Sequence, residues 1–197
     1  MARHGINPDT NNVHKGMTDI MIDIETDGRN ALKNSMVQIA GKKFNIHTGE
    51  IGEDMFIANL KPLEGRVQDP DTMDWWSRQD VTIREGVFEN PLDAGLVMNA
   101  FADWCYPQNT LRFWGKPTHF DFVFVQSYFD ELKIPNPFHY RMARDMNSYI
   151  AALYHPKMRP PDEQVPYNDV GGAHNALSDV INQISELMAH EKHARTQ

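Results

Sequence analysis

The stretch Ile20-Met21-Ile22-Asp23-Ile24-Glu25-Thr26 predicts a buried β-strand, over residues 18–25, that ends in two carboxylates. Residues i and i+2 of a strand point to the same face, so Asp23 and Glu25 project together. Two neighbouring carboxylates repel one another unless a cation lies between them. Hard oxygen ligands at this spacing suit Mg²⁺ or Mn²⁺. The alternative is a strand end that meets solvent, which is the usual meaning of an isolated Asp-x-Glu.

The elements around this strand predict a mixed α/β fold. Two more strands are expected over 35–47 and 51–60, joined at Thr48-Gly49 in an antiparallel meander, and a short one over 111–115. Helices are expected over 70–79, 91–105, 119–133 and 141–154 and from Gly171-Gly172 to about 190, with a proline-rich irregular loop over 155–170. This order predicts one domain, a mixed β-sheet with antiparallel N-terminal strands plus parallel strands, flanked by α-helices.

The composition is typical of a soluble globular protein. Of the 197 residues, 41% are hydrophobic and 23% are charged, and no apolar run is long enough to span a membrane. The single cysteine, Cys105, excludes an intrachain disulfide. The net charge of −8 argues against tight nonspecific binding of duplex nucleic acid, which needs a basic surface. A local contact in which cations neutralise an acidic centre stays open.

The N-terminal segment is expected to lie outside the folded domain. Residues 1–16 are polar, lack periodicity and have no apolar core of a signal peptide. They predict a disordered leader or an artificial remnant, with Met17 as an equally good start and order from Thr18. With the single cysteine, the missing signal peptide indicates a cytoplasmic protein without membrane association.

A third acidic position opens an apolar helical segment in the middle of the chain. Asp121 lies between Phe120 and Phe122, in a segment that continues with Val123 and Phe124. It is either a first-turn acid stabilised by the helix dipole or a buried carboxylate that needs a partner.

A histidine and a fourth acid lie near the C-terminus. His174 and Asp179 are five positions apart, which is about 140° on one helix, so they share a site only if His174 precedes the first turn. The pair Gly171-Gly172 gives the backbone freedom for that placement. Histidine suits a general base because its ordinary pKa lies near neutral pH. A helix-start histidine and a surface aspartate are the alternative.

Taken in chain order, the five residues resemble the catalytic set of the DEDDh 3′–5′ exonucleases, which have a ribonuclease-H-like fold. The resemblance covers most of residues 18–190 and implies a single exonuclease domain over 17–197. Within that superfamily, the chain looks most like the phage and prophage group that includes phage exonuclease A and the ribonuclease AS-like exoribonucleases. The features that carry this likeness are Asp74-Trp75-Trp76 with Gln79, Trp114-Gly115 ahead of Phe120-Asp121, and Ala173-His174-Asn175-Ala176-Leu177.

The resemblance implies a two-metal mechanism. Asp23, Glu25 and Asp179 would hold one Mg²⁺ or Mn²⁺ ion. Asp23 would bridge to a second ion, with Asp121 completing its ligands directly or through water. His174 would deprotonate the attacking water, and the two ions would stabilise the attacking and leaving oxygens of an in-line displacement. The products would be 5′-mononucleotides released from a 3′ end.

The resemblance also implies substrate contacts. Ile24 and Thr26 would meet the 3′-terminal nucleotide through their backbone. Trp75 or Trp76 would line the cleft and stack on a base, because helix neighbours diverge by about 100° and both rings cannot face the core. A structural role for both rings is the alternative. Lys116 departs from the pattern, since many relatives carry Asn there, and it either meets a phosphate or is a solvated lysine.

Positive charge gathers between residues 139 and 159. Arg141, Arg144, Lys157 and Arg159 lie there against one acid, Asp145. This stretch contacts a nucleic-acid backbone, contacts the partner of a dimer or is a solvated face. The pair Arg144-Asp145 resembles an Arg-Asp pair of the same exonuclease group, which favours a substrate contact for Arg144.

The leading expectation is a 3′–5′ exonuclease on single-stranded nucleic acid with a free 3′ end. By resemblance it would be a homodimer, in the host cytoplasm if it is phage-encoded. The phage-like relatives favour DNA over RNA, while an exoribonuclease of the ribonuclease AS or ribonuclease T type stays open because no residue can be assigned to the 2′-hydroxyl. Two alternatives remain: a nucleic-acid-binding or partner-regulating module without turnover, and a metal-dependent endonuclease of the same fold class.

Overall fold

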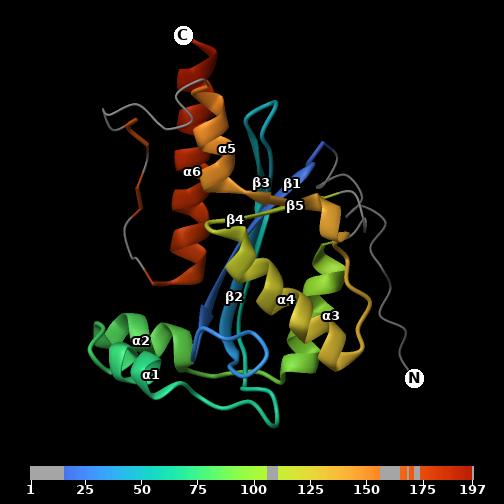
Figure 1. Ribbon diagram of the computed structural model, residues 1–197, viewed down its shortest axis with the longest axis vertical. Coiled ribbons are helices and arrows are strands. Elements are labelled where there is room, and N and C mark those ends of the chain that lie inside the picture. The colour runs from blue at the N-terminus through green and yellow to red at the C-terminus, as the bar shows by residue number, and fades with distance from the viewer. Residues whose placement is uncertain (1–15, 106–110, 156–164, 168, 171–173, 197) are drawn as a thin grey trace.

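A five-stranded sheet with helices on both faces forms the centre of the molecule (Figure 1). The computed structural model describes residues 16–105, 111–155, 165–167, 169–170 and 174–196. The strands are β1 (Asp19–Thr26), β2 (Met36–Asn45), β3 (Glu50–Asn59), β4 (Arg112–Gly115) and β5 (Ala143–Asp145). Their order is β3-β2-β1-β4-β5; the first three are antiparallel, and β4 pairs parallel with both β1 and β5. The predicted meander and mixed sheet are therefore confirmed.

The helices form two layers and a cap at one end of the sheet (Figure 1). One face is covered by α3 (Ala94–Trp104) and α4 (Thr118–Leu132), and the other by α5 (Met146–Leu153) and α6 (Ala176–Arg195). At the end lie α1 (Pro70–Ser77) and α2 (Val81–Phe88), which share a small apolar cluster with β2. A short 3₁₀ turn, η2 (Tyr140–Met142), leads into β5.

The alternation along β1 decides which face carries the chemistry. Ile20, Ile22 and Ile24 are buried in the apolar cluster shared with α3 and α4. Met21 belongs instead to the cluster shared with α5 and α6. Because side chains alternate along a strand, the acids that follow Met21 at every second position also point toward α6.

Side-chain caps set where the helices begin. Asp69, Asp80, Asp93 and Asp145 each accept a backbone N–H at the start of α1, α2, α3 and α5, and Asn175 does so for α6. Such caps replace bonds that the first turn of a helix cannot make internally. The expected helices over 91–105 and 171–190 therefore begin later, at Ala94 and Ala176.

One expectation about secondary structure is wrong, and one helix was not predicted. The helix expected over 141–154 begins only at Met146, because Ala143–Asp145 pair with β4 as a strand. Helix α2 was not expected from the sequence. Some expectations concern residues outside the described part of the chain: the leader, of which only Gly16 is described, most of the loop 155–170, Lys157, Arg159 and Gly171-Gly172. Within the described ranges, no helix has the length and apolar character needed to cross a membrane.

Candidate metal centre and active site

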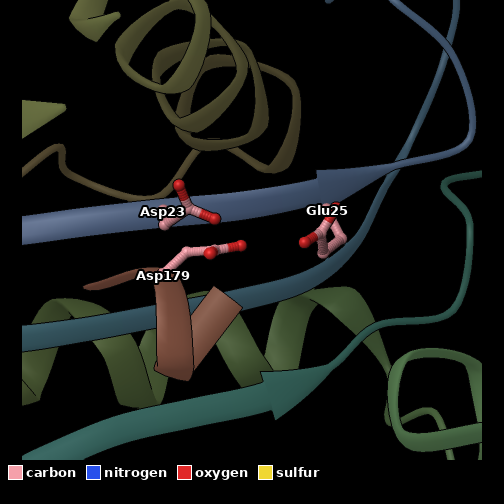
Figure 2. A group of neighbouring side chains, drawn as sticks. All are labelled: Asp23, Glu25 and Asp179. Carbon is pink, nitrogen blue, oxygen red and sulfur yellow. The ribbon is translucent and has the colours of Figure 1, made fainter. Parts of the chain in front are cut away.

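Three carboxylates meet where the end of β1 faces the start of α6. Asp23, Glu25 and Asp179 each offer an oxygen, and these oxygens lie within 4.8 Å of one another. Figure 2 shows Asp23 and Glu25 projecting from β1 and Asp179 reaching toward them from α6. All three residues are half-buried. The structure thus brings together the two acids of the strand motif and the acid of the C-terminal motif.

The docking of α6 on the sheet places Asp179. Asp179 lies in the first turn of α6, beside the fully buried Val180, which packs into the cluster under the helix. The backbone N–H of Ala176 donates to Oε1 of the buried Gln38 at 2.9 Å. Gln38 lies opposite Glu25 in the β1–β2 register. The start of the helix is therefore tied to the sheet at the level of Glu25.

Burial disturbs the ionisation of all three acids, and repulsion by the other acids of the group adds to it for Asp23 and Glu25. Burial, followed by the Asp179 charge, raises the pKa of Asp23 to about 7, against a hydrogen bond from Gln183. Burial, then Asp23 and Asp179, raises the pKa of Glu25 to about 9. Burial also raises the pKa of Asp179, although a hydrogen bond from the His174 backbone opposes it. A divalent cation would relieve this repulsion.

The donor set fits Mg²⁺ or Mn²⁺. Both ions prefer oxygen ligands, and three carboxylate oxygens converge here without a cysteine or histidine among them. The amide of Gln183 donates to Oδ1 of Asp23 at 2.8 Å, while its own Oε1 is buried without a hydrogen-bond partner. Such a bond fixes the orientation of a ligating carboxylate.

Asp121 lies in the first turn of α4 and is 3% exposed. Burial, followed by the charge of Asp23, raises the pKa of its carboxyl well above the ordinary range, while a hydrogen bond from the Ile24 backbone opposes that rise. Gly115 makes room for it, since a Cβ on that residue would lie 2.8 Å from Oδ2 of Asp121. Asp121 is thus a buried carboxylate that the charge of Asp23 affects, and it stands outside the group of three.

His174 precedes the first turn of α6, which is the placement that a shared site with Asp179 needs. Its φ of 66° is in the left-handed region, and Asn175 follows as the N-cap. This turn directs the His174 N–H to Oδ2 of Asp179 at 3.0 Å. The His174 side chain is exposed, and its ring contacts Trp75 with centroids 4.7 Å apart.

The adjacent tryptophans of α1 have different environments. Trp76 is 2% exposed, and its Nε1 donates to the carbonyl of Thr26 at 2.9 Å. Trp75 is half-buried and faces His174. The side chains of Ile24 and Thr26 are buried.

The two basic residues singled out from the sequence are engaged within the protein. Arg144, on β5, donates to the carbonyls of Arg141 and Ala143. Lys116 forms an ion pair with Glu186 of α6 at 2.5 Å. A phosphate contact of Lys116 stays a prediction.

The sequence analysis missed Gln38 and Gln183. Gln183 lies four residues after Asp179, a spacing that places both on one face of a helix, so it was within reach of sequence reasoning. Gln38 carries no such signal, because its partner Ala176 is 138 positions away in the chain.

Known proteins match both the sequence and the fold. The family described as the 3′-5′ exoribonuclease Rv2179c-like domain matches residues 18–189. None of the curated protein sequences matches the chain.

Two solved structures illustrate the likeness of the fold. Exonuclease I of E. coli in complex with a dT13 oligonucleotide has a TM-score of 0.63 at 16% identity, covering 84% of this chain and 39% of that one. Cell-death related nuclease 4 (CRN-4) has a TM-score of 0.61 at 15% identity, covering 86% of this chain and 62% of that one. The chain thus spans about two-fifths of the length of Exonuclease I. The fold is the ribonuclease-H-like fold of exonucleases, as the sequence resemblance implies, and the chain belongs to the Rv2179c-like 3′–5′ exoribonuclease domain family.

Proposed function

We propose that the protein is a metal-dependent 3′–5′ exonuclease that releases 5′-mononucleotides from single-stranded nucleic acid. One observation carries this proposal: Asp23 and Glu25 of β1 and Asp179 of α6 place oxygens within 4.8 Å of one another. The family of the chain supports the direction of cleavage. The exposed His174, bonded through its backbone to Asp179, supplies a base beside these acids.

Each residue of the site has a distinct task in this proposal. Asp23, Glu25 and Asp179 hold one Mg²⁺ or Mn²⁺ ion, and Asp23 with Asp121 serves a second. When bound, the ions supply positive charge that stabilises the attacking and leaving oxygens of the phosphodiester. His174 accepts the proton of the attacking water. Its exposed ring at the mouth of the site can pass that proton to solvent.

The substrate is held, in this proposal, by groups at the end of β1. The backbones of Ile24 and Thr26 lie next to the metal-binding acids and can meet the 3′-terminal nucleotide. Single strands are favoured because a 3′ end must thread down to half-buried carboxylates. Arg144 as a phosphate contact stays a prediction; its two bonds to carbonyls both come from the same guanidinium nitrogen.

The sugar of the substrate is the open chemical question. The family description names exoribonucleases, which supports RNA. The expectation of DNA over RNA, taken from the phage-like resemblance, stays a prediction. The finer grouping with phage exonuclease A and the ribonuclease AS-like enzymes, the homodimer, and a cytoplasmic location also stay predictions.

A paired digestion tests the proposal. Single-stranded DNA and RNA of one sequence, labelled at the 5′ end, are incubated with the protein in Mg²⁺ or Mn²⁺, beside Asp23→Ala and an EDTA control. We expect a ladder that shortens from the 3′ end and is lost in both controls, and the faster substrate identifies the sugar. Internal fragments at early times would indicate an endonuclease instead. Binding of the strand without shortening would indicate a module that lacks turnover.

A further inference from the structure

The tryptophan pair of α1 joins the metal-binding strand to the histidine turn. Trp76 Nε1 donates to the carbonyl of Thr26, the residue directly after Glu25. The Trp76 ring is buried and packs edge-on against Phe88, with centroids 5.2 Å apart. Its contacts therefore anchor α1 to the end of β1.

Trp75 carries this anchor to His174. The rings of Trp75 and Trp76 meet edge-to-face at 74° with centroids 4.9 Å apart. The rings of Trp75 and His174 meet at 86° with centroids 4.7 Å apart. Aromatic rings prefer this perpendicular arrangement over face-to-face stacking. The three rings thus form a row that runs from the anchored Trp76 to the exposed His174.

Other contacts at this turn hold the backbone and leave the imidazole free to rotate. Asp179 accepts the N–H of His174, and Gln38 accepts the N–H of Ala176. Neither bond restricts the side-chain torsions of His174. Among the described residues, Trp75 is the aromatic ring that contacts the imidazole. An exposed histidine without such a neighbour would sample several rotamers.

We propose that Trp75 is a positioning residue that holds the His174 imidazole in its working rotamer. The inference rests on the proposed function, in which His174 takes a proton from the attacking water. A base must lie within hydrogen-bond reach of that proton, and a displacement of about 1 Å can cost a hundredfold in rate. A ring wall beside the imidazole limits that displacement. Trp75 therefore acts through His174 and not by stacking on a nucleobase.

A double-mutant cycle on turnover tests this role. The proteins are the wild type, Trp75→Leu, His174→Ala and the double variant, assayed on the 5′-labelled strand that the wild type degrades faster. We expect His174→Ala to lower kcat by about a hundredfold. We expect Trp75→Leu to lower kcat by roughly ten- to a hundredfold, with KM and Mn²⁺ affinity unchanged. The double variant should match His174→Ala within about twofold, because Trp75 has no effect once its imidazole is gone.

Several results would overturn the proposal. If the effects of Trp75→Leu and His174→Ala on kcat multiply, Trp75 acts independently of His174. If Trp75→Leu raises only KM, Trp75 stacks on a base of the substrate. If His174→Ala keeps full activity, His174 is not the base, and the proposed role of His174 is refuted. This failure differs from an additive cycle, in which His174 is the base but Trp75 does not act through it. Loss of all ladders in the wild type would refute the proposed function as a whole.

Two further variants guard the experiment. Trp75→Phe keeps an aromatic ring and should retain more of kcat than Trp75→Leu; it also replaces Trp75→Leu in the cycle if the latter does not fold. Trp104→Leu is the matched control, since Trp104 is another half-buried tryptophan whose Nε1 donates to Asp54 away from His174. Any effect of Trp104→Leu on kcat should multiply with that of His174→Ala. A non-additive result for this control as well would refute a specific role for Trp75.

Discussion

Replacement of Asp23 by asparagine should stabilise the metal-free protein, although it removes the central ligand of the proposed metal site. In the folded protein, burial and Asp179 raise the pKa of Asp23 from 3.8 to about 7. A raised carboxyl pKa means that folding favours the protonated form. This contribution to stability is complete below the unfolded pKa and is lost as the pH rises through about 7. Asp23→Asn stays neutral at every pH, so it avoids that loss.

The size of the effect follows from the pKa shift. One pKa unit corresponds to about 1.4 kcal/mol, so a shift from 3.8 to about 7 sets an upper bound of roughly 4 kcal/mol near pH 8. The new amide oxygen can still accept the hydrogen bond that Gln183 gives to Asp23. A gain of about 1–4 kcal/mol corresponds to a rise in melting temperature of roughly 3–12 °C for a chain of this length. The gain should shrink toward zero near pH 4.

Thermal unfolding in EDTA, followed by circular dichroism between pH 4 and pH 9, measures this effect. The matched control is Asp19→Asn, the same change on the same strand. Asp19 is fully buried but paired, with Arg112 at 2.6 Å and Trp114 Nε1 at 2.7 Å. That control should lose roughly 3 kcal/mol, because it breaks a buried ion pair. In saturating Mn²⁺, the wild type should melt at a higher temperature than Asp23→Asn, because the ion stabilises the wild type alone. If Asp23→Asn is destabilised in EDTA as the control is, the repulsive cluster does not exist.

Three further results are expected. The Mg²⁺ concentration for half-maximal activity should fall as the pH rises from about 6 to 9, because protons on Asp23 and Glu25 compete with the ion. A Mg²⁺ requirement that does not change with pH would contradict the raised pKa values of about 7 and about 9. Glu25→Ala and Asp179→Ala should each abolish turnover and weaken Mn²⁺ binding measured by calorimetry, and wild-type affinity in either would exclude that residue as a ligand. Gln183→Leu should weaken Mn²⁺ binding by about tenfold with little change in melting temperature, as expected for a group that orients a ligand. Unchanged affinity would show that the bond from Gln183 to Asp23 does not contribute to metal binding.

Local spacing was enough to predict much of the site. The period of two along β1 put Asp23 and Glu25 on one face, and the structure shows them there. For a site shared with Asp179, the angle on a helix required His174 to precede the first turn, and it does. Both conclusions use only neighbours in sequence, where backbone geometry is fixed.

Contacts between distant segments could not be predicted in this way. Ala143–Asp145 is too short to show the alternation of a strand, and its pairing with β4 decides its structure. The divergence of Trp75 and Trp76 was predictable from the helix, but which ring would be buried depends on the carbonyl of Thr26, 50 positions away. Gln38 likewise gains its role only when α6 docks.

The docking of α6 also has a consequence for the growing chain. Asp23 and its partner Gln183 are 160 positions apart, and α6 is the last helix of the described part of the chain. A nascent chain that already has its sheet still lacks the third carboxylate and the histidine. Until the ribosome has passed Asp179 and α6 has packed, the nascent chain therefore cannot assemble the group of three carboxylates.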